Sequence, residues 1–298
     1  MILTAVLILG GTGLVFGVLI AIADRTLRVW EDPRIDTVAG MLPGANCGAC
    51  GVPGCRAFAE KLVGGEARPA GCNVANAEAR DAIASFLGVD AGEAVKVVAR
   101  LLCAGGSEVA RQQAEYRGVS TCAAAAAVAG GGKGCAWGCL GLADCVRSCT
   151  FDAMRMSEDG LPLIDVAKCT ACGDCVEACP KEILTLLPLD RHLLVQCRNL
   201  VAGDAVLEEC RAACTACGKC VMDAAPGLIS VASGVAVIDD SLFALARSSD
   251  IARCPTGAIV WLSGAQFSDG QFAGAPDVAT KITGRRARVA PQLLESAT

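Results

Sequence analysis

Aromatic residues are scarce in this chain, which has seven Phe, three Trp and one Tyr among 298 residues. Aromatic side chains therefore supply little of any core. The one histidine, His192, has no acid/base partner evident in the sequence, so we expect a surface or packing role for it. The formal net charge is -5 and no basic run is present, which argues against nucleic acid as a partner. The sequence also has no motif for a nicotinamide or flavin cofactor.

Cysteine, in contrast, is abundant, with twenty residues. Four of them form a C-x2-C-x2-C-x3-C-P run, the ligand pattern of a bacterial ferredoxin, at Cys169, Cys172, Cys175 and Cys179. Structural zinc also takes four thiolates, but its sites usually split into two knuckles separated by a longer spacer. The run therefore predicts a 4Fe-4S cluster and an electron carrier. Because the fourth cysteine of such a run binds a neighbouring cluster, a second run is expected.

The second run lies upstream and is irregular. Leu142 stands where a regular run has its middle cysteine, and Thr150 stands in the position of the proline. Cys135, one helical turn before Cys139, is a candidate for the missing thiolate. In a two-cluster ferredoxin, the fourth cysteine of each run binds the cluster held by the other run. This exchange of fourth ligands predicts two clusters here. Their ligand sets are Cys135, Cys139, Cys145 and Cys179 for one, and Cys149, Cys169, Cys172 and Cys175 for the other.

A damaged repeat follows near the C-terminus. Its first three cysteines are intact, Ala224 fills the fourth position, and the next run keeps only Cys254 before Pro255. A two-cluster unit that lost one cluster would lose the first three ligands of one run and the last ligand of the other. The remainder predicts one cluster on Cys214, Cys217, Cys220 and Cys254.

A different spacing occurs in the N-terminal third, at Cys47, Cys50, Cys55 and Cys72. Interspersed glycines let the backbone curl and direct amide N–H groups at an anionic centre. We expect a further 4Fe-4S cluster here, with a pair of disulfides as the alternative. The remaining cysteines, Cys103, Cys122, Cys197 and Cys210, are further candidate ligands. They form either a fifth cluster or buried free thiols, so four clusters are predicted and a fifth is left open.

The segment from Ile2 to Ala23 is uncharged and long enough to span a bilayer as a helix. We expect a retained anchor; the alternative is a signal peptide cleaved after Ala23, but no positive region precedes the segment. Arg25, Arg28 and Arg34 follow it, which favours a cytoplasmic location for the rest of the chain.

These features predict an α+β chain with one transmembrane helix, a small helical 4Fe-4S module and ferredoxin-like repeats. Helices are expected over 74–87 and 91–98, and short strands over 160–165 and 234–239. The predicted parts are an anchor (1–23), a linker (24–40), a 4Fe-4S module (41–100), a two-cluster unit (101–190), a one-cluster unit (191–263) and a disordered tail (264–298).

The order of anchor, Glu31-Asp32-Pro33-Arg34 linker, N-terminal cysteine module and ferredoxin repeats resembles the B subunit of the Rnf-type ion-translocating oxidoreductase complex. The resemblance covers residues 1 to about 262. It implies a single-pass protein of the bacterial inner membrane with its clusters on the cytoplasmic side. Such a subunit exchanges electrons with soluble ferredoxin and relays them to other subunits of a ferredoxin:NAD oxidoreductase coupled to sodium or proton transport. The alternatives are a self-contained reductase, an electron carrier of another membrane redox complex, and a zinc scaffold without redox activity.

Overall fold

A computed structural model of the chain describes residues 2–27, 31–268 and 271–272. The first element is α1 (Ile2–Leu27), whose stretch Thr4–Leu27 has a mean hydropathy of 2.5. Within the described residues it is the one helix long and apolar enough to cross a membrane. The helix runs four residues past the predicted end at Ala23 and includes Asp24 and Arg25.

A small helical module follows, made of α2 (Arg34–Met41), α3 (Cys55–Val63), η1 (Pro69–Gly71) and α4 (Ala77–Leu87). Its core contains the fully buried Val38 and Ile83, packed with Phe58 and Leu62. Asn76 caps α4 by accepting a hydrogen bond from the Ala79 N–H. Part of the predicted linker is therefore helical, because α2 packs against α3.

The helix predicted over 91–98 is wrong. Residues 91–96 are irregular, and the chain then enters strand β1 (Val97–Leu101). Asn73 accepts a hydrogen bond from the Val97 N–H (2.6 Å) and donates one to the Val97 carbonyl (2.9 Å). These bonds, together with pairing to β4, satisfy an extended backbone in a valine-rich segment that favours strand.

The first ferredoxin-like unit is built from two antiparallel strand pairs. The outer pair is β1 with β4 (Leu184–Pro188), and the inner hairpin is β2 (Met154–Met156) with β3 (Pro162–Ile164), as expected near 160–165. Helices α6 (Asp144–Ser148) and α7 (Asp174–Glu177) lie together between them. The predicted boundary at residue 101 cuts through β1, which belongs entirely to this unit.

The second unit repeats this topology. Its outer pair is β5 (Leu193–Val195) with β8 (Ile259–Trp261), and its hairpin is β6 (Ile229–Ala232) with β7 (Val235–Ile238). Helix α8 (Lys219–Asp223) takes the place of α6, and η5 (Ser248–Ile251), preceded by η4 (Asp240–Leu245), takes that of α7. His192 stacks on Trp261 with ring centroids 5.2 Å apart, which confirms a packing role.

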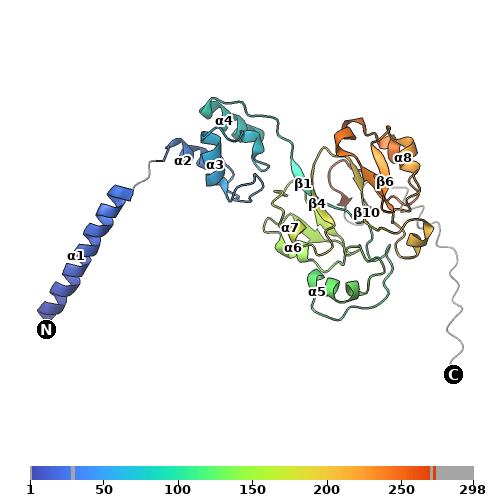
Figure 1. Cartoon of the computed structure of the whole chain (residues 1–298), viewed down its shortest axis with the longest axis horizontal. Coiled ribbons are helices and arrows are strands. Elements are labelled where there is room, and N and C mark those ends of the chain that lie inside the picture. The colour runs from blue at the N-terminus through green and yellow to red at the C-terminus, as the bar shows by residue number, and fades with distance from the viewer. Residues whose placement is uncertain (1, 28–30, 269–270, 273–298) are drawn as a thin grey trace, which may run out of the picture.

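Each unit carries an insertion between its first strand and its first helix. The first insertion contains α5 (Cys122–Ala127) and η2 (Ala129–Gly132), and the second contains η3 (Asp204–Glu208). An isolated bridge pairs Ala110 of the first insertion with Cys210 of the second. Figure 1 shows the helical module with α2 to α4 beside the units that carry α5 to α8.

The predicted disordered tail begins too early. Gln266 is 2% exposed; its side-chain amide donates to the Leu101 carbonyl (2.6 Å) and accepts from the Leu101 N–H (2.9 Å). Phe267 starts β9 (Phe267–Ser268), which pairs with β10 (Gln271–Phe272). Residues 264–268 are thus packed on the first unit, and the rest of the predicted tail, apart from β10, lies outside the described residues.

Candidate iron-sulfur sites

Three hollows in the two ferredoxin-like units are each lined by four cysteines. Each hollow lies beside the short helices of a unit, where the cysteine runs begin and end. The shared lining indicates that all three suit the same kind of group.

The sites are numbered in the order in which their ligands were predicted along the chain, with the helical module as the first. The third site is the hollow lined by Cys149, Cys169, Cys172 and Cys175. Cys149 directly follows α6, Cys169 and Cys172 come from the turn that leads into α7, and Cys175 lies in α7. The backbone curls because Ala171 and Gly173 have φ of 62° and 96°. These are the four cysteines that the exchange of fourth ligands predicts for one cluster.

A buried cation lies near this site. Arg100 of β1 is 1% exposed, and its Nη1 donates to the Gly264 carbonyl (2.7 Å). Its Nε and Nη2 make no hydrogen bond within the described part of the chain. Burial lowers the pKa of Arg100, and the charge of Cys169 opposes that shift. An anionic group bound by Cys169 would offset the cost of burying this charge.

The second site differs from the prediction in one ligand. Cys139, Cys145 and Cys179 line the hollow as expected, but the fourth cysteine is Cys122 and not Cys135. Cys122 is the first residue of α5 and thus comes from the insertion that follows β1. It occupies the role that Leu142 leaves open.

Contacts between α5 and α6 explain this choice. The Ala123 N–H donates to Asp144 Oδ2 (3.0 Å), and Arg147 Nη2 donates to the Ser120 carbonyl (3.1 Å). Because Asp144 directly precedes Cys145, these bonds hold the start of α5, and with it Cys122, against the second site.

The fourth site is lined by Cys214, Cys217, Cys220 and Cys254, the set that the damaged repeat predicts. Arg253 donates two hydrogen bonds from Nε to the carboxylate of Asp223, at 2.7 and 3.0 Å. Since Asp223 ends α8, this pair holds the loop of Cys254 beside the helix that carries Cys220. Of the twenty cysteines, all of them described, only Cys217 is exposed.

The first predicted set, Cys47, Cys50, Cys55 and Cys72, lies in the helical module and is called the first site below. Asn46 Oδ1 accepts a hydrogen bond from the Cys55 N–H (2.9 Å), which draws the start of α3 toward the loop of Cys47. Burial raises the pKa of Cys50, and the thiols of Cys72 and Cys47 add to the shift. The structure thus brings Cys47, Cys50 and Cys72 within electrostatic range of one another.

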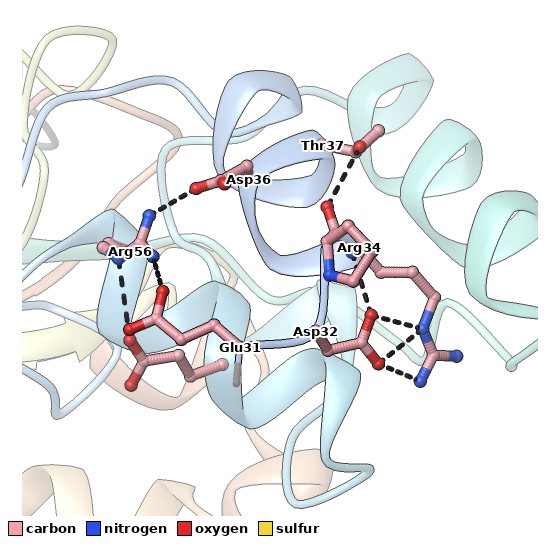
Figure 2. A network of polar contacts seen from close by, with 8 residues as sticks. Glu31, Asp32, Arg34, Asp36, Thr37 and Arg56 are labelled. Carbon is pink, nitrogen blue, oxygen red and sulfur yellow. Dashed lines mark hydrogen bonds and ion pairs between the residues drawn. The ribbon is translucent and has the colours of Figure 1, made fainter. Parts of the chain in front are cut away.

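A polar network surrounds the residue after Cys55 (Figure 2). Arg56 pairs with Glu31 and Asp36, each at 2.5 Å, while Arg34 binds Asp32 at 2.6 Å. Hydrogen bonds from Arg34 hold the pKa of Asp32 below its usual value. Individual surface pairs contribute little, but this network connects the segment after α1 to α2 and α3. It fixes the start of the module near the first site.

The thiols fit a cluster better than a single ion. A tetrathiolate zinc site needs four sulfur atoms at about 2.3 Å from one point. No group of three or more His, Cys, Asp or Glu side chains within the described residues could hold a metal ion. Four cysteines around a hollow instead suit a cube, in which each thiolate binds a different iron.

Burial also affects the protonation of the site thiols. It raises the pKa of Cys139 and Cys145 to about 12 and that of Cys220 to about 11. These thiols stay protonated at neutral pH in the iron-free chain, so iron binding must release their protons.

Comparison with known proteins agrees with this picture. Residues 42–74 match the family described as "Putative Fe-S cluster", and residues 134–184 match the "4Fe-4S dicluster domain". The B subunit of the ion-translocating oxidoreductase complex of Methanosarcina acetivorans is 37% identical over 86% of this chain and 97% of its own length.

The chain belongs to the family of B subunits of ion-translocating oxidoreductase complexes. A second member, from the proton-translocating ferredoxin:NAD(+) oxidoreductase complex of Clostridium ljungdahlii, is 38% identical over 83% of this chain and 88% of its own length. A third, from the Na(+)-translocating ferredoxin:NAD(+) oxidoreductase complex of Acetobacterium woodii, is 48% identical over 72% of this chain and 64% of its own length. Family membership confirms the resemblance inferred from the order of the modules.

The structure places two residues at or near the cysteine sites of this B subunit that sequence reasoning did not assign to them. Cys122 counted only as a further candidate ligand, because it stands 17 residues before Cys139 and outside any run. Arg100 gave no signal at all, since a single arginine in a strand is ordinary until its burial is known. Cys135, assigned to the second site, lies instead near Cys103, Cys197 and Cys210.

Proposed function

We propose that the chain is a membrane-anchored electron-transfer subunit. It exchanges electrons with soluble ferredoxin and relays them to partner subunits of a ferredoxin:NAD oxidoreductase complex coupled to sodium or proton transport. The 4Fe-4S clusters of its sites supply one-electron transfer when bound.

The observation that carries the proposal is the succession of cysteine sites through the fold. Asn73, next to Cys72 of the first site, donates to the carbonyl of Thr170, next to Cys169 of the third site (2.9 Å). Cys145 of the second site and Cys175 of the third belong to one buried core. Sites that contact one another in this way are suited to pass electrons from one cluster to the next.

The two ends of this succession face different surroundings. The first site lies in the module that follows α1 and is connected to the linker by the pairs of Arg56. The fourth site carries Cys217, the exposed cysteine. We infer that the fourth site exchanges electrons with a partner that approaches from solvent, and that the first site lies toward the membrane-bound subunits.

The names of the relatives support the assignment of the whole complex. Those from Acetobacterium woodii and Clostridium ljungdahlii are subunits of ferredoxin:NAD(+) oxidoreductases that translocate sodium ions and protons. The arginines after the apolar segment, Arg25, Arg28 and Arg34, favour a cytoplasmic location of the clusters, where reduced ferredoxin is available.

The test is reduction of the anaerobically purified full chain by reduced ferredoxin, followed as bleaching of its visible cluster absorbance. Rapid bleaching is expected. The bleaching rate should fall in the variant Lys219→Glu, because Lys219 lies beside the fourth site and a surface charge near a docking site alters the rate of association. The matched control is Lys61→Glu in the helical module, which should leave the rate unchanged. Bleaching by dithionite but not by ferredoxin would contradict the proposal. Stoichiometric flavin in the purified chain would favour a self-contained reductase.

A further inference from the structure

Four cysteines lie outside the four sites and yet close together, although they span more than one hundred positions of the sequence. They are Cys103, Cys135, Cys197 and Cys210. A Cβ atom added at Gly105 would lie 3.1 Å from Cys210 Sγ and 3.7 Å from Cys103 Sγ. These two sulfur atoms therefore border the same small space, which the absence of a side chain at Gly105 leaves open.

Asn199 connects the other two cysteines. Its backbone N–H donates to Cys197 Sγ (3.5 Å), and its side-chain Nδ2 donates to Cys135 Sγ (3.6 Å). Cys197 packs against the buried core that contains Cys210. Through Gly105, Asn199 and this core, the four cysteines converge on one region of the fold.

Several N–H groups point at the sulfur atoms of this region. Cys103 Sγ accepts from the N–H groups of Gly105 and Cys139, both at 3.4 Å. With the two bonds from Asn199, four N–H groups point at three sulfur atoms, and a neutral thiol is only a weak acceptor. Lys133 brings a positive charge, because its Nζ donates to the carbonyls of Gly105 and Cys139, both at 2.5 Å.

These side chains are also shielded from water. Cys103, Cys135 and Cys210 are 7%, 8% and 7% exposed. Cys210 packs with Val109 and Val206 in a buried core made by both insertions. The bridge between Ala110 and Cys210 fixes the two insertions to each other.

We propose that Cys103, Cys135, Cys197 and Cys210 bind a fifth 4Fe-4S cluster, formed jointly by the insertions of the two ferredoxin-like units. This inference rests on the proposed electron-transfer function and extends it.

The position gives this fifth site a role. The Cys139 N–H, at a ligand of the second site, donates to Cys103 Sγ. At the other side, Ala213, next to Cys214 of the fourth site, belongs to the buried core that contains Cys210 and contacts Cys197. The fifth site therefore bridges the two units. An electron that passes through it oxidises one neighbouring cluster by one electron and reduces the other by one, with no bond or proton transferred.

The test begins with iron and acid-labile sulfide in the anaerobically prepared full chain. About twenty irons per chain are expected with five cubes, and about sixteen would overturn the fifth site while leaving the proposed function intact. A chain without iron would overturn both, so the two failures are distinguishable.

The double variant Cys103→Ala/Cys210→Ala then assigns the ligands. It should lose about four irons and one component of the EPR spectrum of the reduced protein, while the components of the other clusters remain. The control Val109→Ala removes packing from the same core and should keep all the iron. Unchanged iron and EPR in the double variant would refute the assignment.

A milder change guards against misfolding of that variant. Gly105→Ala would push a methyl group against the sulfur atoms of Cys103 and Cys210 and should perturb the same EPR component. Gly40→Ala is its control, because nothing lies within 4 Å of a Cβ there. Identical spectra for both glycine variants would contradict the fifth site.

Discussion

The buried Arg100 should set the reduction potential of the third site. Reduction adds a negative charge to the cluster, and a nearby guanidinium stabilises that charge, so Arg100→Gln should make the potential more negative. At an effective dielectric constant of about 20, a unit charge about 6 to 12 Å away contributes about 1.4 to 2.8 kcal/mol. For one electron this corresponds to about 60 to 120 mV, because about 1.4 kcal/mol equals about 59 mV. Burial of Arg100, at 1% exposed, keeps the interaction from being screened by water and salt.

The assay is an EPR-monitored redox titration in which the third-site component is identified by its loss in Cys172→Ala. Arg100→Lys keeps the charge and should retain most of the potential. The matched control is Lys96→Gln, which removes a cation whose Nζ donates to the Ala167 carbonyl from an exposed position. Its shift should stay below about 20 mV, since exposed charges are screened. An Arg100→Gln shift that is positive, or no larger than that of Lys96→Gln, would refute the reasoning.

Three further outcomes are expected. Cys254→Ala should remove the fourth cluster or convert it to a three-iron form, and unchanged iron content and EPR would show that Cys254 is not a ligand. Gln266→Leu should lower the free energy of unfolding in urea by about 2 to 4 kcal/mol, because it leaves the buried N–H and carbonyl of Leu101 without their partner; equal midpoints for variant and wild type would contradict this. Deletion of residues 2–27 should release a soluble chain that keeps its iron, whereas a mature protein found to begin at Asp24 would exclude a retained anchor.

The sequence could predict the sites whose ligands stand in a regular cysteine run. It could also predict the site in the damaged repeat, where the remaining cysteines of two runs still make one complete ligand set. Cys169 to Cys175 follow a local spacing, and the link from Cys220 to Cys254 follows from the symmetry of the repeat. The choice between Cys122 and Cys135 could not be predicted, because tertiary contacts of α5 with Asp144 decide it.

The errors in secondary structure have the same origin. The apolar spacing over 91–98 fits a helix, but Asn73 and strand β4 supply long-range partners for Val97 and make it extended. The polar start of the tail likewise reads as disorder until Gln266 is seen to bond to Leu101, which is 165 positions away. Local sequence pattern predicts the elements whose hydrogen-bond partners are close in the sequence. The prediction fails where those partners are distant.

The most direct test of the account is a complete metal and sulfide analysis of the full chain prepared without oxygen. We assign the twenty cysteines to five sets of four, so the account predicts about twenty irons, an equal amount of labile sulfide and no stoichiometric zinc. Two or fewer irons together with stoichiometric zinc would contradict it, because the cysteine sites would then be structural and the chain could not carry electrons.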